Sequence, residues 1–114
     1  MPSASSASRF FLVVRFWVAP QAEAAMLRWL EGGHVAEVVG QPGFLWCKRI
    51  RLEPKDGWNG YSMIYGIESR AAFERYNSNE TLMAKFAKQR EPFEGLLKID
   101  RFFGDVDFAV DSGT

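Results

Sequence analysis

Hydrophobic positions in this chain follow two spacings, a strand-like period of two and a helix-like period of three to four. Short runs rich in β-branched and aromatic residues predict strands over residues 9–18, 44–52, 61–67 and 96–103. In the first run one face carries only apolar side chains, namely Phe10, Leu12, Val14, Phe16 and Val18. The opposite face carries Phe11, Val13, Arg15 and Trp17, so both faces of this strand are mostly apolar.

The first helical stretch begins at Pro20, which suits the first turn of a helix. Apolar residues then recur with helical spacing over the next ten positions. We expect this helix to end at Gly32 or Gly33, because each interior glycine costs about 1 kcal/mol relative to alanine. Residues 34–39 are predicted as a second short helical segment that ends in a turn.

The second helical stretch follows Ser69, a predicted N-cap, and resumes after a break at Asn79, a second predicted cap. Between the second and third strands, residues 53–60 contain Pro, Asp-Gly and Asn-Gly, which favour turns and predict a hairpin. Beyond the last strand, residues 105–110 alternate acidic and apolar side chains and are expected to be extended.

The predicted order is strand, helix, strand, strand, helix, strand. Its simplest compact solution is an α+β, ferredoxin-like fold, in which a four-stranded antiparallel sheet carries both helices on one face. The strands nevertheless offer large apolar residues on both faces. Because monomers seldom expose so large an apolar area, we expect a second copy to cover the other face. The result is a homodimer that closes into an α/β barrel, with residues 105–110 available to reach across.

The chain of 114 residues is predicted as one domain over residues 9–110, with flexible tails at 1–8 and 111–114. Fourteen basic and fourteen acidic residues leave no formal charge, which argues against nucleic acid or an anionic membrane as a partner. No apolar run is long enough to span a membrane. Because Cys47 is the single cysteine and no Cys/His spacing resembles a metal site, we expect a cytoplasmic protein without a bound metal.

Three features of the chain resemble the dimeric α/β-barrel superfamily. They are the order of the elements, the five-residue step from Trp29 to His34, and the segment from Val39 that ends in Gly43-Phe44. The resemblance covers residues 9–103 and is closest to small EthD-like and stress-responsive members. It implies a dimer with a pocket in each protomer. The superfamily includes cofactor-independent monooxygenases, lactone isomerases, polyketide cyclases and haem-degrading enzymes, so it restricts the fold more than the function.

His34, the only histidine, is the leading candidate for a catalytic residue. An imidazole with an ordinary pKa near 6.5 can take a proton from an activated carbon or phenol and return it elsewhere. Tyr65 and Arg49 are the predicted catalytic partners, because a phenol can orient a carbonyl and a guanidinium can hold a carboxylate or enolate. The alternative is that His34 caps a helix end or bonds a carbonyl. Glu31 and Glu37 are the nearest carboxylates in sequence that could orient the ring.

Six further residues are predicted to contact the substrate, and they are Arg15, Trp17, Trp46, Tyr61, Trp58 and Asn59. The resemblance associates Trp, Asn and Tyr with binding of an aromatic polyketide, and those types meet in Trp58-Asn59-Gly60-Tyr61. For the arginine, the alternative is a side chain that reaches water or pairs with an acid. For the aromatic residues it is core packing, and a hairpin turn alone accounts for Asn59-Gly60.

We therefore expect a small-molecule enzyme that uses neither a metal nor an organic cofactor, an isomerase, cyclase or monooxygenase acting on a small, largely apolar ring compound. Haem is not expected, because the second helical region has no histidine to serve as the axial ligand. Two alternatives stay open. One is a non-catalytic module that binds a small ligand, and the other is a structural homodimer whose barrel is filled by its own Trp and Phe side chains.

Overall fold

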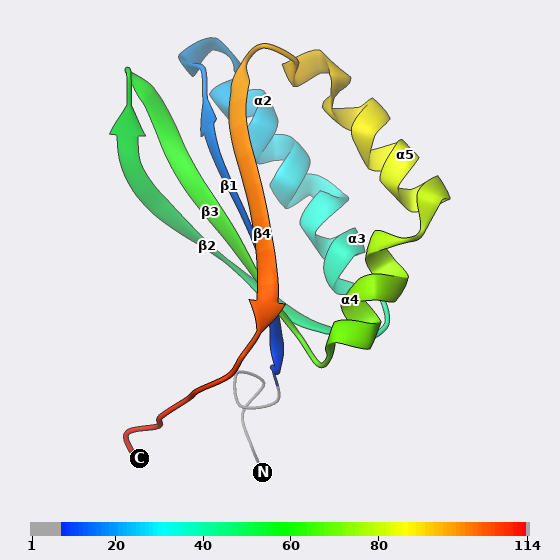
Figure 1. Ribbon diagram of the computed structural model, residues 1–114. Helices are drawn as coiled ribbons and strands as arrows, with labels where there is room; N and C mark the ends of the chain where they lie inside the picture. Colours follow the sequence, from blue (N-terminus) through cyan, green and yellow to red (C-terminus); the bar gives the residue numbers. More distant parts are fainter. Residues whose placement is uncertain (1–7, 114) are drawn as a thin grey trace.

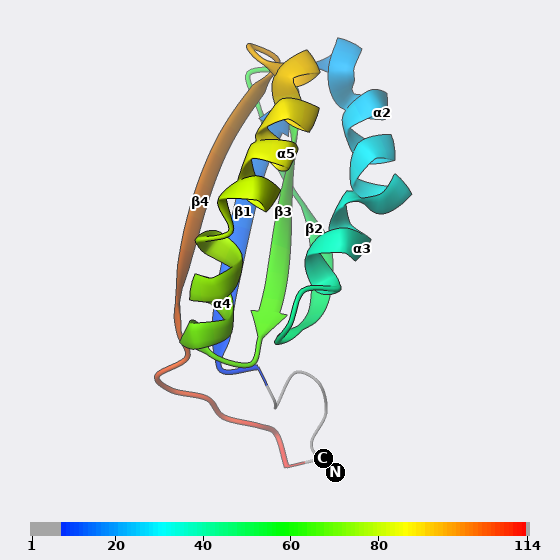
Figure 2. The same ribbon diagram turned by 90° about the vertical axis from the view of Figure 1, so that its right-hand side faces the viewer.

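The computed structural model describes residues 8–113 and has two layers, a sheet and a set of helices that cover one of its faces (Figures 1 and 2). The strands are β1 (Phe10–Val18), β2 (Phe44–Lys55), β3 (Trp58–Ile67) and β4 (Leu97–Asp105). All neighbouring strands are antiparallel, in the order β2-β3-β1-β4. The helical segments are α2 (Pro20–Trp29), η1 (Leu30–His34), α3 (Val35–Val39), α4 (Arg70–Asn77), α5 (Glu80–Arg90) and η2 (Glu91–Phe93). The predicted ferredoxin-like α+β fold is confirmed.

Both predicted helix caps of the second helical region form as expected. The Ser69 side chain accepts a hydrogen bond from the Ala72 amide at 3.1 Å, and the Asn79 side chain accepts one from Leu82 at the same distance. Each bond satisfies an amide that has no partner within its helix. The break between α4 and α5 could therefore be predicted from Asn79, the N-cap of α5.

The hairpin between β2 and β3 is tighter than the sequence suggested. Its turn consists of Asp56 and Gly57 alone, both with positive φ, of 53° and 80°. A two-residue turn of this kind matches the right-handed twist of the two strands, so the strands continue to the turn. Asn59-Gly60 is therefore part of β3, and the prediction of a turn across residues 53–60 was too long. Pro54 fits because β2 is an edge strand with an irregular register there.

The first helical region does not stop at its glycines. A single π-helical turn, η1, joins α2 to α3, and Gly33 absorbs the distortion with a φ of 155°. The wider turn forms a bond from the Val35 amide to the Leu30 carbonyl. In an α-helix the fifth residue along points well away from the first, whereas this turn brings His34 back beside Trp29. The prediction that the helix ends at Gly32 or Gly33 was therefore wrong, because the helical region continues through them and changes direction there.

The two faces of the sheet have opposite surroundings. Toward the helices, the side chains of Phe10, Leu12, Phe16 and Val18 are at most 1% exposed and form the centre of the core. On the outer face no helix covers the sheet (Figure 2), and Phe102 there is 51% exposed. The predicted alternation of β1 is therefore confirmed, with its wholly apolar face inward.

Beyond β4 the chain has no regular structure over residues 106–113. Its first amide, that of Val106, donates to the Arg9 carbonyl at 2.9 Å. Phe108 and Val110 are then 81% and 76% exposed. Of the predicted N-terminal tail, only Ser8 falls within the described residues, and it is buried.

Candidate functional site

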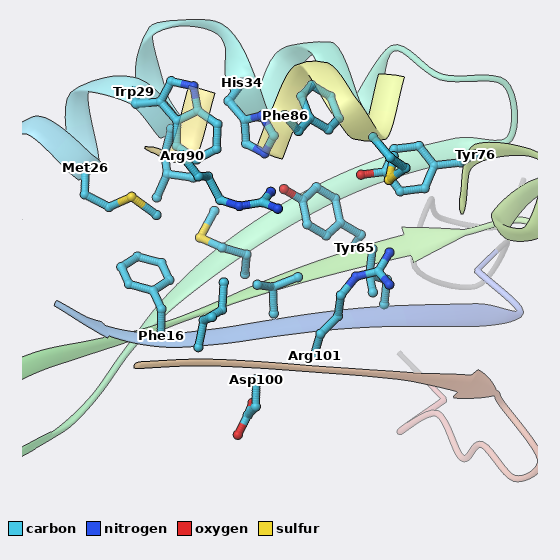
Figure 3. Close-up of a pocket in the computed structure, with 16 residues that line it drawn as sticks. Phe16, Met26, Trp29, His34, Tyr65, Tyr76, Phe86, Arg90, Asp100 and Arg101 are labelled. Atoms are coloured by element: carbon cyan, nitrogen blue, oxygen red, sulfur yellow. The ribbon is translucent and has the colours of Figure 1, made fainter. Parts of the chain in front are cut away.

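A cavity of about 380 Å³ lies between the sheet and the helical layer (Figure 3). Its floor is formed by apolar side chains of β1 and β3, and its roof by side chains of α2, η1, α4 and α5. The titratable side chains that point into it are His34, Tyr65, Tyr76, Arg90 and Arg101. The site is thus an apolar chamber with a small number of polar groups, the composition typical of small-molecule pockets.

His34 is held in the roof by aromatic contacts. Its ring stacks on Trp29 at 4.0 Å between centroids and meets the Phe86 ring edge-on at 4.5 Å. Its Nδ1 is buried and makes no hydrogen bond within the described part of the chain. An imidazolium needs an acceptor for both N–H groups. Burial, followed by the nearby charge of Arg90, lowers the pKa of His34 to about 4, although Glu37 opposes this. The ring is therefore neutral at pH 7, and Nε2 is the nitrogen that a ligand can reach.

Tyr65 reaches the cavity from β3 and lies opposite the helical roof (Figure 3). Burial raises the pKa of its phenol well above the ordinary value of 10, and neighbouring Cys47 and Tyr76 act in the same direction. The phenol is therefore a hydrogen-bond donor at every physiological pH. Burial also raises the pKa of the Cys47 thiol to about 11, so the thiol is not a nucleophile at neutral pH.

Arg90 and Arg101 bring two guanidinium groups to the same cavity. Arg90 descends from the end of α5, and Arg101 rises from β4 (Figure 3). Sequence reasoning missed Arg90 as a site residue, although a signal was present. Met83, Phe86 and Arg90 stand at the spacing of one helix face, which places Arg90 on the buried side of α5. Tyr76 of α4 also lines the cavity and was not among the predicted site residues.

Arg49, predicted as catalytic, lies next to the cavity and not in it. It lines a neighbouring groove beside α3, whose wall includes Met63 and Leu30, residues shared with the cavity. Its guanidinium pairs with Glu31 at 2.7 Å. Because Arg49 is paired with an acid and lies outside the cavity, it is less able to bind a substrate there than Arg90 or Arg101.

Tyr61, Asn59 and Trp58 gather at the start of β3, away from the cavity lining. The Tyr61 hydroxyl donates to Glu23, and the Asn59 amide donates to both oxygens of the same carboxylate at 2.9 and 3.0 Å. The bond to Glu23 also raises the pKa of Tyr61. Trp58 lies beneath the ammonium group of Lys98 at 5.2 Å. These three residues fasten β3 to α2 and β4, and the cavity does not include them.

Arg15 lies on the outer face of the sheet. It donates two hydrogen bonds to Asp100, its partner across β4, at 2.9 and 2.7 Å. These bonds lower the pKa of Asp100. The guanidinium also lies over the rings of Trp17 and Phe102, at 5.8 and 5.5 Å. The alternative considered for this arginine, pairing with an acid, is thus what forms, and it forms within one chain.

Trp17 and Trp46 also lie on the outer face, and each faces a glycine of β3. Trp17 is opposite Gly60, and Trp46 is opposite Gly66. A Cβ atom at either glycine would come within 2.4 Å or less of the facing indole. The indoles therefore fill the space left by the missing side chains, a packing role that requires glycine on the neighbouring strand.

Neither a metal centre nor a membrane helix is found in residues 8–113. No three side chains of His, Cys, Asp or Glu type within that range are placed to hold a metal ion. Within the same range, no helix combines the length and the apolar character needed to cross a membrane.

Solved structures share this fold at low sequence identity. A monooxygenase from the gene ActVA-Orf6 of Streptomyces coelicolor, in complex with nanaomycin D, is 20% identical with a TM-score of 0.63, covering 94% of this chain and 95% of that one. A single-site mutant of SnoaB, a cofactor-independent oxygenase from Streptomyces nogalater, is 18% identical with a TM-score of 0.63, covering 90% and 98%. MhuD, a haem degrader from Mycobacterium tuberculosis with two haems bound in its active site, is 20% identical with a TM-score of 0.60, covering 90% and 99%.

These similarities concern the fold, and they do not show the expected closeness to EthD-like members. No curated protein matches the chain in sequence. A family model does match, over residues 10–97, and it describes a domain of unknown function, DUF4286. That match spans most of the chain, which therefore belongs to the DUF4286 family.

Proposed function

We propose that the chain is an enzyme that removes a proton from a small, largely apolar ring compound bound in the cavity, without a metal or organic cofactor. The observation that carries the proposal is the convergence of a neutral imidazole and a protonated phenol on one apolar chamber. His34 approaches from the roof and Tyr65 from the sheet (Figure 3). Pairs of this kind, one base and one donor with separated pKa values, are typical of acid–base sites.

The proposed step moves one proton. Nε2 of His34, in the tautomer that carries its hydrogen on the enclosed Nδ1, takes it from an acidic C–H or O–H of the ring. The electron pair stays on the ring as an enolate or phenolate. Tyr65 donates a hydrogen bond to the developing oxyanion, and the positive charge of Arg90 stabilises it further. Return of the proton at another atom gives isomerisation, and attack of the carbanion on a carbonyl gives cyclisation. Addition of dioxygen at the carbon of the enolate gives a hydroperoxide, and its loss of water leaves one oxygen in the product as a carbonyl, the outcome favoured by the oxygenase neighbours.

A second candidate is a binding module without turnover. The observation that favours it is the pKa of His34, about 4, because so weak a base removes protons only from acidic substrates. A structural homodimer filled by its own aromatic side chains is the third candidate. The cavity within one chain weighs against it.

We propose that the chain works as a homodimer through the outer face of the sheet. Phe102 and Ile50, on that face, are 51% and 47% exposed, and Phe11 and Val13 between them are only half-buried. A second copy is the economical cover for such a patch, and the exposed apolar residues after β4 extend it. Sedimentation velocity tests this proposal. We expect the native chain to sediment as a dimer and Phe102→Glu as a monomer.

Haem, which one structural neighbour binds, does not fit the donor set of this cavity. The only histidine is stacked on Trp29 and bordered by Phe86, and its Nδ1 is enclosed. The one remaining nitrogen, Nε2, comes from the first helical region, and the second helical region supplies no histidine to hold the iron. We propose the cytoplasm as the compartment, because Cys47 is a free thiol that carries no disulfide.

Native mass spectrometry of freshly purified protein, followed by turnover assays on any retained compound, tests the proposed function. The expected result is a dimer mass with a bound small molecule that is chemically changed on incubation. His34→Gln and Tyr65→Phe should each lower the rate at least about 100-fold, the usual contribution of a general base. Arg75→Gln, an exposed position on α4 away from the cavity, is the matched control with an unchanged rate.

Oxygen consumption separates monooxygenation from isomerisation and cyclisation. Recovery of the compound chemically intact after prolonged incubation would overturn the enzyme in favour of the binding module. If no apolar compound raises the thermal stability, the structural dimer is correct, because a ligand that binds only the folded state must stabilise it.

A further inference from the structure

We propose that the ring compound bound in the cavity is a carboxylic acid, whose carboxylate is held between Arg90 and Arg101. This inference rests on the proposed small-molecule function and specifies the class of ligand. It places the apolar part of the ligand deep in the chamber, among Phe16, Met26 and Trp29, and the acid at the side of β4.

The positive charges of the two arginines in the cavity are not neutralised by acids of the same chain. Among residues 8–113, no ion pair involves Arg90 or Arg101. The acid in the cavity lining, Asp100, and the acid that acts on His34, Glu37, are already engaged. Asp100 points away from the cavity to the outer face (Figure 3), where it pairs with Arg15. Glu37 pairs with Lys85 at 2.6 Å. The chamber therefore contains two positive charges and no negative one to neutralise them.

Arg101 is held in a position that favours binding of a carboxylate. One of its terminal nitrogens donates to the Asn77 side chain at 2.8 Å, and its guanidinium carbon lies 5.6 Å from the centre of the Phe73 ring. These two contacts fix the plane of the group, and they use only one of its N–H donors. The remaining donors are available for the two-pronged pairing with a carboxylate that a guanidinium makes best.

The two arginines approach from opposite layers. Arg90 extends down from α5 and Arg101 up from β4, and both point toward the space around Tyr65 (Figure 3). Burial lowers the pKa of Arg101, Tyr76 opposes this, and the nearby charge of Arg90 lowers it further. The same charge lowers the pKa of His34. An anion between the two guanidinium groups offsets the charge of Arg90 that acts on both Arg101 and His34, so it binds where positive charge is concentrated.

The alternative is that each guanidinium simply extends past the apolar wall into water, as long charged side chains commonly do. The exposure of Arg101 favours this alternative, and Ile99, on the same face of β4, is 51% exposed. The two views differ in one measurable property. A pair of solvated arginines gives no preference between an acid and its neutral amide.

Isothermal titration calorimetry with matched acid and amide pairs decides between them. The probes are benzoate and benzamide, 2-naphthoate and 2-naphthamide, and 2-anthracenecarboxylate and its amide, which differ in charge and hardly in shape. For at least one pair, the native protein should bind the acid about tenfold more tightly than the amide, because hydrogen bonds to a charged group are the stronger ones. In Arg90→Gln and Arg101→Gln that preference should fall to within about twofold, with the affinity for the amide retained.

The controls separate this inference from the proposed function. Arg75→Gln should keep the full preference for the acid, and circular dichroism should show that every variant is folded. Equal binding of acid and amide by the native protein would overturn the carboxylate site and leave the apolar cavity intact. Failure of every probe to bind the native protein would overturn the small-molecule function itself. An unchanged preference in both arginine variants would show that another group recognises the acid.

Discussion

The two faces of the sheet are built from similar residue types and behave differently. Toward the helices, aromatic and aliphatic side chains are enclosed and leave one cavity of about 380 Å³ with a few polar groups. On the outer face, aromatic side chains lie beside charged ones, with Arg15 over Trp17 and Lys48 over Trp46. Inside, neither Arg90 nor Arg101 has an ion pair within the described residues and the buried Nδ1 of His34 has no partner, whereas outside Arg15 is paired with Asp100. The unpaired positive charges, and not the unpartnered Trp46 Nε1 of the outer face, are what a ligand of opposite charge would satisfy.

This contrast also separates two kinds of aromatic residue. Trp17 and Trp46 fill the space above glycines and are explained by packing. Trp29 forms part of the chamber wall and stacks on the only histidine. Residue type alone does not distinguish these roles, but the face of the sheet or helix does.

The largest expected difference between the faces comes from removal of one phenylalanine on each. Phe16→Ala should lower the free energy of unfolding by about 3–5 kcal/mol, because its side chain is 1% exposed. Phe102→Ala, at a position that is 51% exposed, should cost well under half as much in the monomer. Urea unfolding at several protein concentrations measures both. Equal losses at every concentration would contradict the distinction between the faces.

The next effect tests the packing role of the outer tryptophans. Gly66→Ala should cost about 1–3 kcal/mol, because the added Cβ would lie 2.2 Å from the Trp46 ring and the indole must move. Gly104→Ala is the matched control, since nothing lies within 4 Å of its added Cβ. Thermal unfolding compares the two. If both glycines tolerate alanine equally, Trp46 is not locked in place.

A smaller effect appears with pH and belongs to the inner face. The pKa of His34 is about 4 in the folded chain against 6.5 when exposed, so its contribution to stability is complete above pH 6.5 and disappears as the pH falls toward 4. After allowance for solvent screening we expect this loss to be about 1–2 kcal/mol. His34→Phe keeps the aromatic stack and removes the titration. Unfolding at pH 7 and pH 4.5 should show a shallower decline for this variant, and identical declines would contradict the buried imidazole.

The smallest effect is expected on the outer face. Asp100→Asn removes the charge that pairs with Arg15, and both partners are well exposed. Exposed ion pairs contribute little to stability, so in the monomeric Phe102→Glu background the melting temperature should stay within the error of the measurement. In the dimer the pair lies within the proposed interface and a larger effect is expected, whereas a large loss in the monomeric background would contradict an exposed pair.

Sequence periodicity was sufficient for the architecture, since strand alternation and two helix caps reflect local chemistry. The site was only partly predictable. His34 and Tyr65 line the cavity, because the helix and strand that carry them could be placed from the sequence. The outward direction of Arg15 and Trp17 could not be known, because a shift of one residue exchanges the two faces of a strand. The π-helical turn could not be predicted either, because a pair of glycines looks the same in the sequence whether it ends a helix or forms a π-helical turn within it.

The most direct test of the cavity is an NMR pH titration of the His34 ring, followed at its ¹³Cε1 signal, which is unambiguous because the chain has one histidine. We predict a midpoint near pH 4 in the unliganded protein, which rises when 2-naphthoate is added because a carboxylate offsets the charge of Arg90. A midpoint near 6.5 that does not respond to the acid would mean that the imidazole faces water. The chamber described between the sheet and the helices would then not exist.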